Sequence, residues 1–395
     1  MTRKLRAKQL IPTVAVTLGV AVGLAACSST SPSASKTSAK TTTTATKTTG
    51  STGSTSTSTA STVKTIKVEK PATATIAEAG SSLLYPLWNI WVPGYNQTYP
   101  KVTVQTAAGG SGKGISGAMN GTLQIGSSDA YLSTADKQQK PTMLNIPLAI
   151  SAQQIYYNIP NVSAHLKLNG KILAGMYTGK ITKWSTSAIT SINPGLTLPT
   201  LPVVTLHRAD GSGDTFLFTS YLSKTTKTWS TKFGFNTTVT WPAAPGALAE
   251  TGNSGMVAGC KATPGCVAYI GISYQTQALG AALAYASMEN GAGKYVLPTA
   301  TTIQAEANGY TAKTPATGAI SMIDGTGGYP IINYEYGVVS KKQSSTTEAK
   351  AVRSLLEWAI SPKDGNSNTY MSQVGFRPLP TKVIKQSYTQ IKSIK

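Results

Sequence analysis

HRADGSGDTF, at residues 207–216, follows a β-type run, Leu201–Leu206, and leads into a helical pattern, Thr215–Leu222. The same order occurs earlier, where the β-type residues 102–104 precede a glycine-rich turn and a helix expected from Ile115. Residues 346–360 add a further segment with apolar side chains at helical spacing. Repetition of strand, turn and helix is typical of α/β folds, whose ligands bind at the carboxyl ends of the strands, where these turns lie.

Three turns rich in glycine and serine share one chemistry. They read GSSLL at 80–84, GGSGKG at 109–114 and DGSGDT at 210–215, and Arg208 stands just before the third. Each offers hydroxyl groups and the free N–H groups of a helix start, whose partial positive charge suits an oxyanion. Glycine also lets a ligand come close to the backbone.

A single turn of this kind is most often only a helix cap. The second turn is also not a P-loop, because Ala107 stands where a P-loop has its first glycine and Gly114 where it has serine or threonine. Three such turns with an arginine beside one of them favour a site for a tetrahedral oxyanion.

An aspartate, Asp129, ends the nearby sequence GSSD at 126–129. A carboxylate beside an anion site is explained if the anion carries a proton, because the carboxylate then accepts a hydrogen bond from it. Phosphate carries such a proton at neutral pH, whereas sulfate does not and would be repelled. The alternative is that Asp129 caps a helix or stabilises a turn. Asp214 also has these two interpretations, as an acceptor of a phosphate proton or as a helix cap or turn residue.

The charge of the chain does not indicate a nucleic-acid-binding protein. Lysine and arginine number 35 against 14 acidic residues, for a net charge of +21, but no run of five basic residues and no alternation of basic and aromatic residues occurs. Only two histidines are present, without C-x-x-C or H-E-x-x-H, so zinc and haem enzymes are disfavoured. No metal or cofactor is expected.

Residues 1–26 have the pattern of an export signal: a basic start and then an apolar run, Leu10–Gly23, too short to span a membrane. Small residues precede Cys27 as in the lipobox of bacterial lipoproteins, and this resemblance implies cleavage before Cys27 and lipidation of its sulfur. The alternative is an ordinary signal peptide with a chance cysteine. Serine and threonine fill 25 of the 35 positions in 28–62, so residues 27–70 are expected to be a disordered tether.

Two further cysteines, Cys260 and Cys266, flank a Pro-Gly turn. In an oxidising compartment this spacing favours a small disulfide loop. Metal binding by the two thiolates is the alternative, but no histidine or third cysteine lies near them in the sequence.

Together these motifs resemble the PstS family, the phosphate-binding proteins of the bacterial Pst phosphate ABC transporter. The resemblance covers nearly all of residues 71–395 and is closest to the lipoprotein form of actinobacteria, mycobacteria included. It rests on HRADGSGDTF at 207–216, PGAL at 245–248, TPGCVAYIGIS at 263–273 and YPIINYEY at 329–336.

The resemblance implies a two-lobed, class-II periplasmic-binding-protein fold of the α/β class. Lobe I would comprise 71–156 plus 322–395 and lobe II 157–321, with crossings near Ile155–Asn158 and Ser321–Asp324. The lobes would close over inorganic phosphate, and the protein would deliver it to the ABC permease subunits. Binding without chemistry is expected, outside the cell membrane, with the lipid anchor as the only membrane contact and no nucleic-acid partner.

The resemblance also implies roles for individual residues. Asp129 would accept the phosphate proton, Arg208 would donate a bidentate pair of hydrogen bonds, and Asp210 would orient Arg208. The remaining donors would be hydroxyls and backbone N–H groups of the three turns, namely Ser82, the N–H of Leu83, Ser111, Ser212 and the N–H of Gly213. Asp214 is expected to contact phosphate by accepting a second proton, with bonding only to protein as the alternative.

Three other functions fit the sequence less well. A hydrolase would use Ser212 as nucleophile, but Ser212 is not in a G-x-S-x-G motif and only His207 lies near it in sequence. A surface adhesin would use the tether as a stalk. A sulfate or molybdate binder is disfavoured by Asp129.

Overall fold

The computed structural model describes residues 66–395, which belong to one compact unit of the chain, 60–395. The predicted export signal, Cys27 and most of the predicted tether lie outside the described residues. Among the helices of 66–395, none combines the length and the apolar character needed to cross a membrane.

The first strands form a parallel layer. β1 (Ala74–Gly80) pairs with β2 (Val102–Ala108) on one side and β3 (Ile125–Ser128) on the other. α1 (Tyr85–Thr98) follows β1, α2 (Ser111–Asn120) follows β2, and α3 (Thr134–Gln139) follows β3. The predicted helix start at Ile115 is wrong by four residues: Gly110 adopts a φ of 83°, which turns the chain directly into α2 at Ser111.

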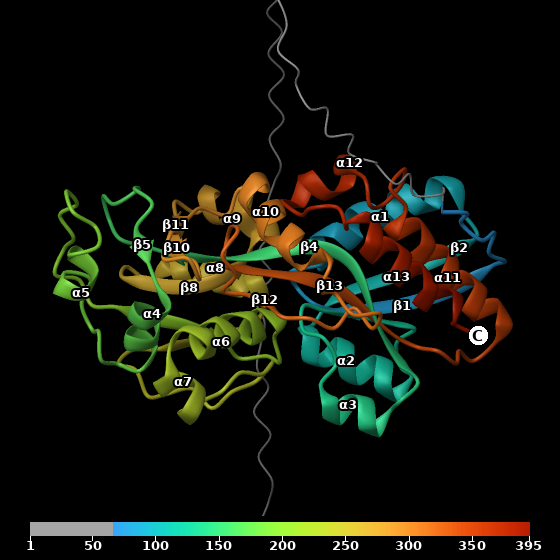
Figure 1. The fold of residues 1–395 in the computed structure, drawn as a ribbon, viewed down its shortest axis with the longest axis horizontal. Coiled ribbons are helices and arrows are strands. Elements are labelled where there is room, and N and C mark those ends of the chain that lie inside the picture. The colour runs from blue at the N-terminus through green and yellow to red at the C-terminus, as the bar shows by residue number, and fades with distance from the viewer. Residues whose placement is uncertain (1–65) are drawn as a thin grey trace, which may run out of the picture. The chain divides into compact units, whose positions relative to one another are not determined.

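Two long antiparallel strands, β4 (Met143–Tyr157) and β13 (Ile331–Ser340), run through the middle of the sheet (Figure 1). Every residue of β4 is buried; the strand pairs with β13 as far as Ala152 and with β8 from Gln153 onward. The sheet of the described residues therefore continues through β4, in the order β2-β1-β3-β13-β4-β8-β6-β7.

The second group of strands is again parallel. β6 (Val204–Arg208) lies between β7 (Leu248–Glu250) and β8 (Cys266–Gly271). The predicted strand at 201–206 is shifted, because Pro202 has no N–H for a ladder and the strand begins after it. α6 (Gly213–Thr225) follows β6, and α8 (Gly252–Ala262) joins β7 to β8. The predicted disulfide between Cys260 and Cys266 links the end of α8 to β8.

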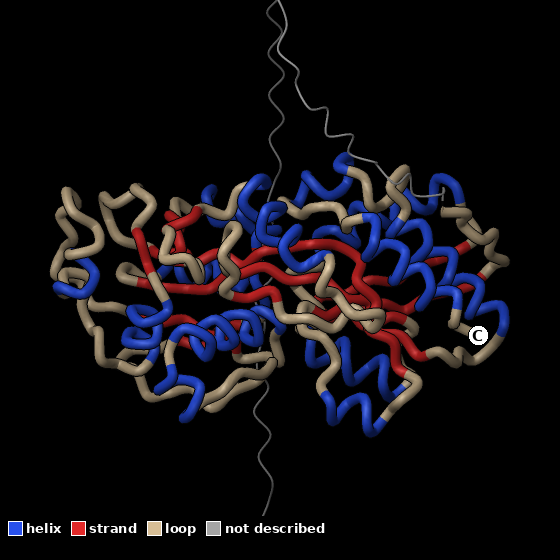
Figure 2. Tube along the Cα trace, viewed as in Figure 1, coloured by secondary structure: helices blue, strands red, loops and turns tan. Residues whose placement is uncertain are grey.

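The remaining helices and short strands pack around these layers. Figure 2 shows the strands in the interior with helices on either side. α11 occupies the predicted residues 346–360 and begins after Ser345, whose side chain accepts from Glu348 N–H. The helices are α4 (Gly170–Tyr177), α5 (Ser187–Thr190), α7 (Lys227–Lys232), η1 (Ile272–Tyr274), α9 (Gln275–Gly280), α10 (Ala300–Thr311), α11 (Thr346–Ile360), α12 (Asn368–Met371), η2 (Ser372–Val374) and α13 (Thr381–Lys392). The short strands are β5 (Lys167–Leu168), β10 (Ser287–Glu289) and β11 (Tyr295–Val296) in a separate sheet, with β9 (Ala284–Tyr285) beside β4 and β12 (Met322–Ile323) beside β13.

One carboxyl group, Glu78 on β1, is buried within the sheet. Its Oε2 has no hydrogen-bond partner among the described residues. Burial raises the pKa of Glu78 to about 8, against the hydrogen bond with Ser127, which acts in the opposite direction. The folded protein therefore retains a proton that the unfolded chain releases near its ordinary value of 4.5. The contribution of Glu78 to the free energy of unfolding is therefore fully present below pH 4.5 and falls as the pH rises toward 8.

We expect Glu78→Gln to remove this pH dependence. Near pH 8 the free energy of unfolding of the variant should exceed that of the wild type by roughly 1–4 kcal/mol, and near pH 4.5 the two should be similar. Urea unfolding at the two pH values measures this, with Asp364→Asn as a control at a partly exposed carboxyl group. Equal pH dependence of wild type and Glu78→Gln would contradict the assignment.

Candidate functional site

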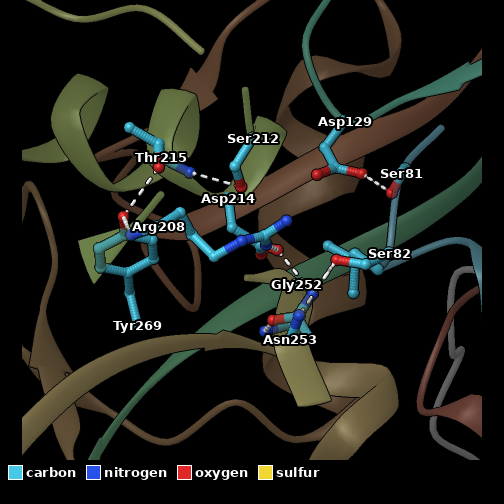
Figure 3. A network of polar contacts seen from close by, with 12 residues as sticks. Ser81, Ser82, Asp129, Arg208, Ser212, Asp214, Thr215, Gly252, Asn253 and Tyr269 are labelled. Atoms are coloured by element: carbon cyan, nitrogen blue, oxygen red, sulfur yellow. Dashed lines mark hydrogen bonds and ion pairs between the residues drawn. The ribbon is translucent and has the colours of Figure 1, made fainter. Parts of the chain in front are cut away.

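The turns after β1, β2, β3 and β6 meet at one place. The N–H of Gly112, the second residue of α2, donates to the carbonyl of Gly211 in the turn after β6 at 2.9 Å. A methyl group added at Gly213 would overlap Asp129 and Ser111, so the start of α6 lies directly against both residues. Figure 3 shows the polar side chains of these segments gathered in one network.

Arg208 is the last residue of β6, and its side chain is 1 % exposed. Its Nε donates to Asp210 Oδ1 at 2.7 Å, its Nη2 donates to Asp210 Oδ2, and its Nη1 donates to Asp214 Oδ2 at 3.1 Å. A guanidinium carries five donor hydrogens. The contacts to these two carboxylates therefore leave one hydrogen on each of Nη1 and Nη2 for a further acceptor.

Asp210 pairs with Arg208 through both of its carboxylate oxygens. Besides the two contacts from Arg208, its Oδ1 accepts from the N–H of Gly252 at 3.1 Å. Burial is the largest effect on its pKa and raises it, but the hydrogen bond and charge of Arg208 together hold the pKa of Asp210 below its usual value. The pair is therefore an ionised guanidinium and an ionised carboxylate.

Asp214, the second residue of α6, is buried and has protein donors at both oxygens. Oδ2 accepts from Asn253 Nδ2 at 2.6 Å and from Arg208, and Oδ1 accepts from Gln153 Nε2 at 3.1 Å. Burial, and then the charge of Asp129, raises the pKa of Asp214 to about 7, while Arg208, Gln153 and Asn253 act against the rise. Both carboxyl oxygens of Asp214 therefore accept hydrogen bonds from protein groups.

Asp129 directly follows β3 and is 2 % exposed. Its carboxylate accepts from the hydroxyl of Ser81, and its N–H donates to Ser111 Oγ at 3.1 Å. Burial raises the pKa of Asp129, against hydrogen bonds with Glu335, Ser81 and Ser111 and the charge of Arg208. Asp129 caps no described helix, because the cap of α3 is Ser133.

Ser82 and Leu83, in the turn after β1, contact α8 and the end of β8. Ser82 Oγ accepts from the N–H and from Nδ2 of Asn253, at 3.2 and 3.0 Å. The Leu83 side chain packs on Gly271, where a Cβ would overlap it. In the turn after β1, Ser81 and not Ser82 contacts Asp129. Figure 3 shows these two neighbouring serines directed to different partners.

The side chains that a hydrolase would need are used otherwise. Ser212 Oγ accepts from the N–H of Thr215 at 3.3 Å and caps α6. The His207 ring stacks on Trp241, with centroids 4.9 Å apart, and burial lowers the pKa of His207. No hydrogen bond joins His207 to Ser212 among the described contacts, so the nucleophile–base pair of a serine hydrolase is not formed.

Four polar residues of the network were not predicted from the sequence: Ser81, Gln153, Asn253 and Glu335. Asn253 bridges three groups: its side chain contacts Ser82 and Asp214, and its Oδ1 accepts from the N–H of Gly271 at 2.8 Å. GNSG at 252–255 is a further glycine- and serine-rich helix start, which is the signal that could have identified Asn253. Gln153 lies inside the buried strand β4 and has no such signal. In the described residues, no three His, Cys, Asp or Glu side chains are placed to hold a metal ion.

Comparisons with known proteins point to one class. Residues 31–363 match a family model described as a PBP superfamily domain. The chain is similar to the phosphate-binding protein PstS of Xylella fastidiosa (strain Temecula1), with 32% identity over 322 residues, 80% of this chain and 85% of the relative. It is also similar to the phosphate-binding protein PstS3 of Mycobacterium bovis (strain BCG), with 27% identity over 337 residues, 81% of this chain and 86% of the relative.

Solved structures show the same fold. A high-affinity periplasmic phosphate-binding protein, PfluDING, solved with phosphate at pH 8.5, superposes with a TM-score of 0.63 at 21% identity, covering 78% of this chain and 92% of the other. The α/β, two-lobed class-II fold that the sequence predicted is therefore confirmed, with β4 and β13 running between the two groups of parallel strands.

Proposed function

Because this chain belongs to the PBP superfamily and, within it, to the PstS family of phosphate-binding proteins, we propose that it binds inorganic phosphate at the network around Arg208 and delivers it to an ABC permease. The observation that carries the proposal is the convergence of Arg208, with two free donor hydrogens, on the starts of α2 and α6 and on Asp129. Its relatives are named as binding proteins and not as enzymes, and we assign no catalytic residue.

Each segment would supply a different contact to phosphate. The free hydrogens of Arg208 would donate to one or two phosphate oxygens, and Asp210 and Asp214 hold the guanidinium for that task. The hydroxyls of Ser111 and Ser212 and the first N–H groups of α6, beginning at Gly213, would donate to the others. Ser82 and the N–H of Leu83 would complete the set if Ser82 exchanges Asn253 for the ligand.

Asp129 would set the choice of anion. As an ionised acceptor it would receive the hydrogen of HPO₄²⁻ or H₂PO₄⁻, whereas every oxygen of sulfate would repel it. Its burial supports this role, because a repulsive charge acts more strongly where water is excluded.

The remaining proposals concern architecture and location. We propose lobe I at 71–156 plus 322–395 and lobe II at 157–321, supported by the change of β4 from pairing with β13 to pairing with β8. Contacts such as Gly112 with Gly211 would then form when the lobes close. Cleavage before Cys27 and lipidation of its sulfur would hold the protein to the outer face of the cell membrane through its tether.

Thermal unfolding of the anion-free protein tests phosphate binding. A ligand that binds only the folded state stabilises it by about 4 kcal/mol at a concentration 1,000 times its Kd. We therefore expect the Tm to rise with phosphate concentration and to be unchanged by equal concentrations of sulfate or chloride. A Tm that no phosphate concentration shifts would contradict the proposed function.

A further inference from the structure

A second buried carboxyl group, Glu335, lies against Asp129. Glu335 is on β13, where its neighbour Tyr336 pairs with Ser128, the residue before Asp129. Asn333 Nδ2 connects the two segments, donating to the Asp129 carbonyl at 3.2 Å and to Glu335 Oε1 at 3.0 Å. The carboxyl groups of Glu335 and Asp129 are within hydrogen-bonding reach of each other.

The backbone of β13 makes this approach possible. Its pairing with β4 shifts register between Glu335 and Tyr336, so that Glu335 is opposite Ala149 and Tyr336 opposite Pro147. Such a bulge changes the direction of a side chain and is often found beside a functional site. Glu335 is 0 % exposed, so no water at the protein surface solvates its charge.

The hydroxyl group of Ser151 supplies fewer hydrogens than the oxygen contacts of this cluster require. Ser151 Oγ lies 2.6 Å from Asn333 Oδ1 and 2.5 Å from Glu335 Oε1, and both of these are acceptors when Glu335 is ionised. Ser151 has a single hydrogen. Glu335 Oε2 finds no donor among the described residues, and the Asp129 carboxylate is the neighbouring group with which the Glu335 carboxyl group can share a hydrogen. A proton on Glu335 turns its contact with Asp129 into a hydrogen bond, whereas two ionised carboxylates would repel each other.

The surrounding charges decide which carboxyl group holds this proton. Burial and then the charge of Asp129 raise the pKa of Glu335 well above its ordinary value, with Ser151 and Asn333 acting in the opposite direction. Arg208 stabilises the charge on Asp129, whereas Asp214 opposes it. Tyr336, next to Glu335, stays neutral because burial raises its pKa.

We propose that Glu335 is a positioning residue that keeps a proton at neutral pH and donates it to Asp129, so that Asp129 is an oriented, ionised acceptor for the phosphate hydrogen. This inference rests on the proposed function. Ser81 and Glu335 then both donate hydrogen bonds to the Asp129 carboxylate, and its remaining lone pairs are directed to the ligand. Loss of the Glu335 proton at alkaline pH would put two charges side by side and weaken phosphate binding.

Glu335→Gln separates this role from a merely structural one. The glutamine amide still donates to Asp129 but cannot ionise, so phosphate affinity at neutral pH should stay within about threefold of wild type. At alkaline pH the wild type should lose affinity and the variant should lose less. Glu335→Leu removes the donor and should lose at least about tenfold at neutral pH. A Glu335→Gln variant that is tenfold weaker at neutral pH, or that follows the wild-type pH profile, would overturn the proposal.

Infrared spectroscopy of the ligand-free protein tests the proton itself. Glu78 and Asp214 also have raised pKa values, so the informative quantity is the spectrum of wild type minus that of Glu335→Gln. It should contain the carbonyl stretch of a neutral carboxylic acid at neutral pH, and its absence would overturn the proposal. If the wild type bound no phosphate, the proposed function would fail, but this difference band would still report the shared proton.

Discussion

Phosphate affinity is expected to fall by roughly 2–5 kcal/mol, about 30-fold to several thousandfold, when Arg208 is replaced with alanine. The guanidinium is buried, and its Nη1 and Nη2 each keep one hydrogen that no described residue accepts. We assign both hydrogens to phosphate. Removal of the guanidinium also leaves the Asp210 and Asp214 carboxyl groups without their cation, so the emptied site would repel an anion. Titration calorimetry with phosphate measures the loss.

Two further variants show whether the loss in Arg208→Ala comes from this guanidinium and its planar shape. Arg208→Lys keeps the charge but not the planar fork, so it should recover only part of the affinity. Arg353→Ala removes a guanidinium that pairs with Glu69 near the surface, Nε to Oε2 at 2.7 Å, and should leave phosphate binding unchanged. Wild-type affinity in Arg208→Ala would show that phosphate does not bind at this network.

Anion selectivity is expected to change in Asp129→Asn. The amide keeps an oxygen for Ser81 and offers an N–H to the ligand, so repulsion of sulfate is replaced by a hydrogen bond. Sulfate binding, absent from the wild type, should become measurable. Phosphate should bind roughly tenfold more weakly, because its hydrogen loses a charged acceptor. Competition of sulfate with phosphate in calorimetry gives both values.

Asp214→Asn is the matched control for Asp129→Asn. Both carboxyl groups are buried and both influence Arg208, but the oxygens of Asp214 are occupied by Asn253, Gln153 and Arg208. Sulfate should therefore remain excluded from Asp214→Asn. If Asp129→Asn excludes sulfate as strictly as the wild type does, the proton-acceptor explanation of selectivity is wrong.

Local sequence signals predicted much of the fold and part of the site. Glycine-rich turns between β-type and helical patterns predicted that α2 and α6 exist but placed their starts four and two residues too late, and the helix at 346–360 was predicted to the residue because its apolar spacing is regular. The family resemblance implied the pairing of Arg208 with Asp210, and the two side chains are hydrogen-bonded in the structure. The error at the start of β6 arose at Pro202, and the error at the start of α2 arose where Gly110 turns the backbone.

The rest of the site depends on contacts between distant segments. Asn253 reaches Ser82 across 171 positions of the chain, and Asn333 reaches Asp129 across 204. Gln153 and Glu335 lie within strands buried along most of their length, where a polar residue gives no local indication of its partner. Ser81 was missed for a different reason: two adjacent serines are equally suited to the turn, and only the fold decides which faces Asp129.

The most direct test of the central claim is isothermal titration calorimetry of the anion-free protein with phosphate and then with sulfate at neutral pH. The account predicts tight binding of one phosphate per chain and no heat from sulfate. Binding of both anions would retain the site but contradict the role of Asp129. A folded, anion-free sample that binds neither anion would contradict the account as a whole.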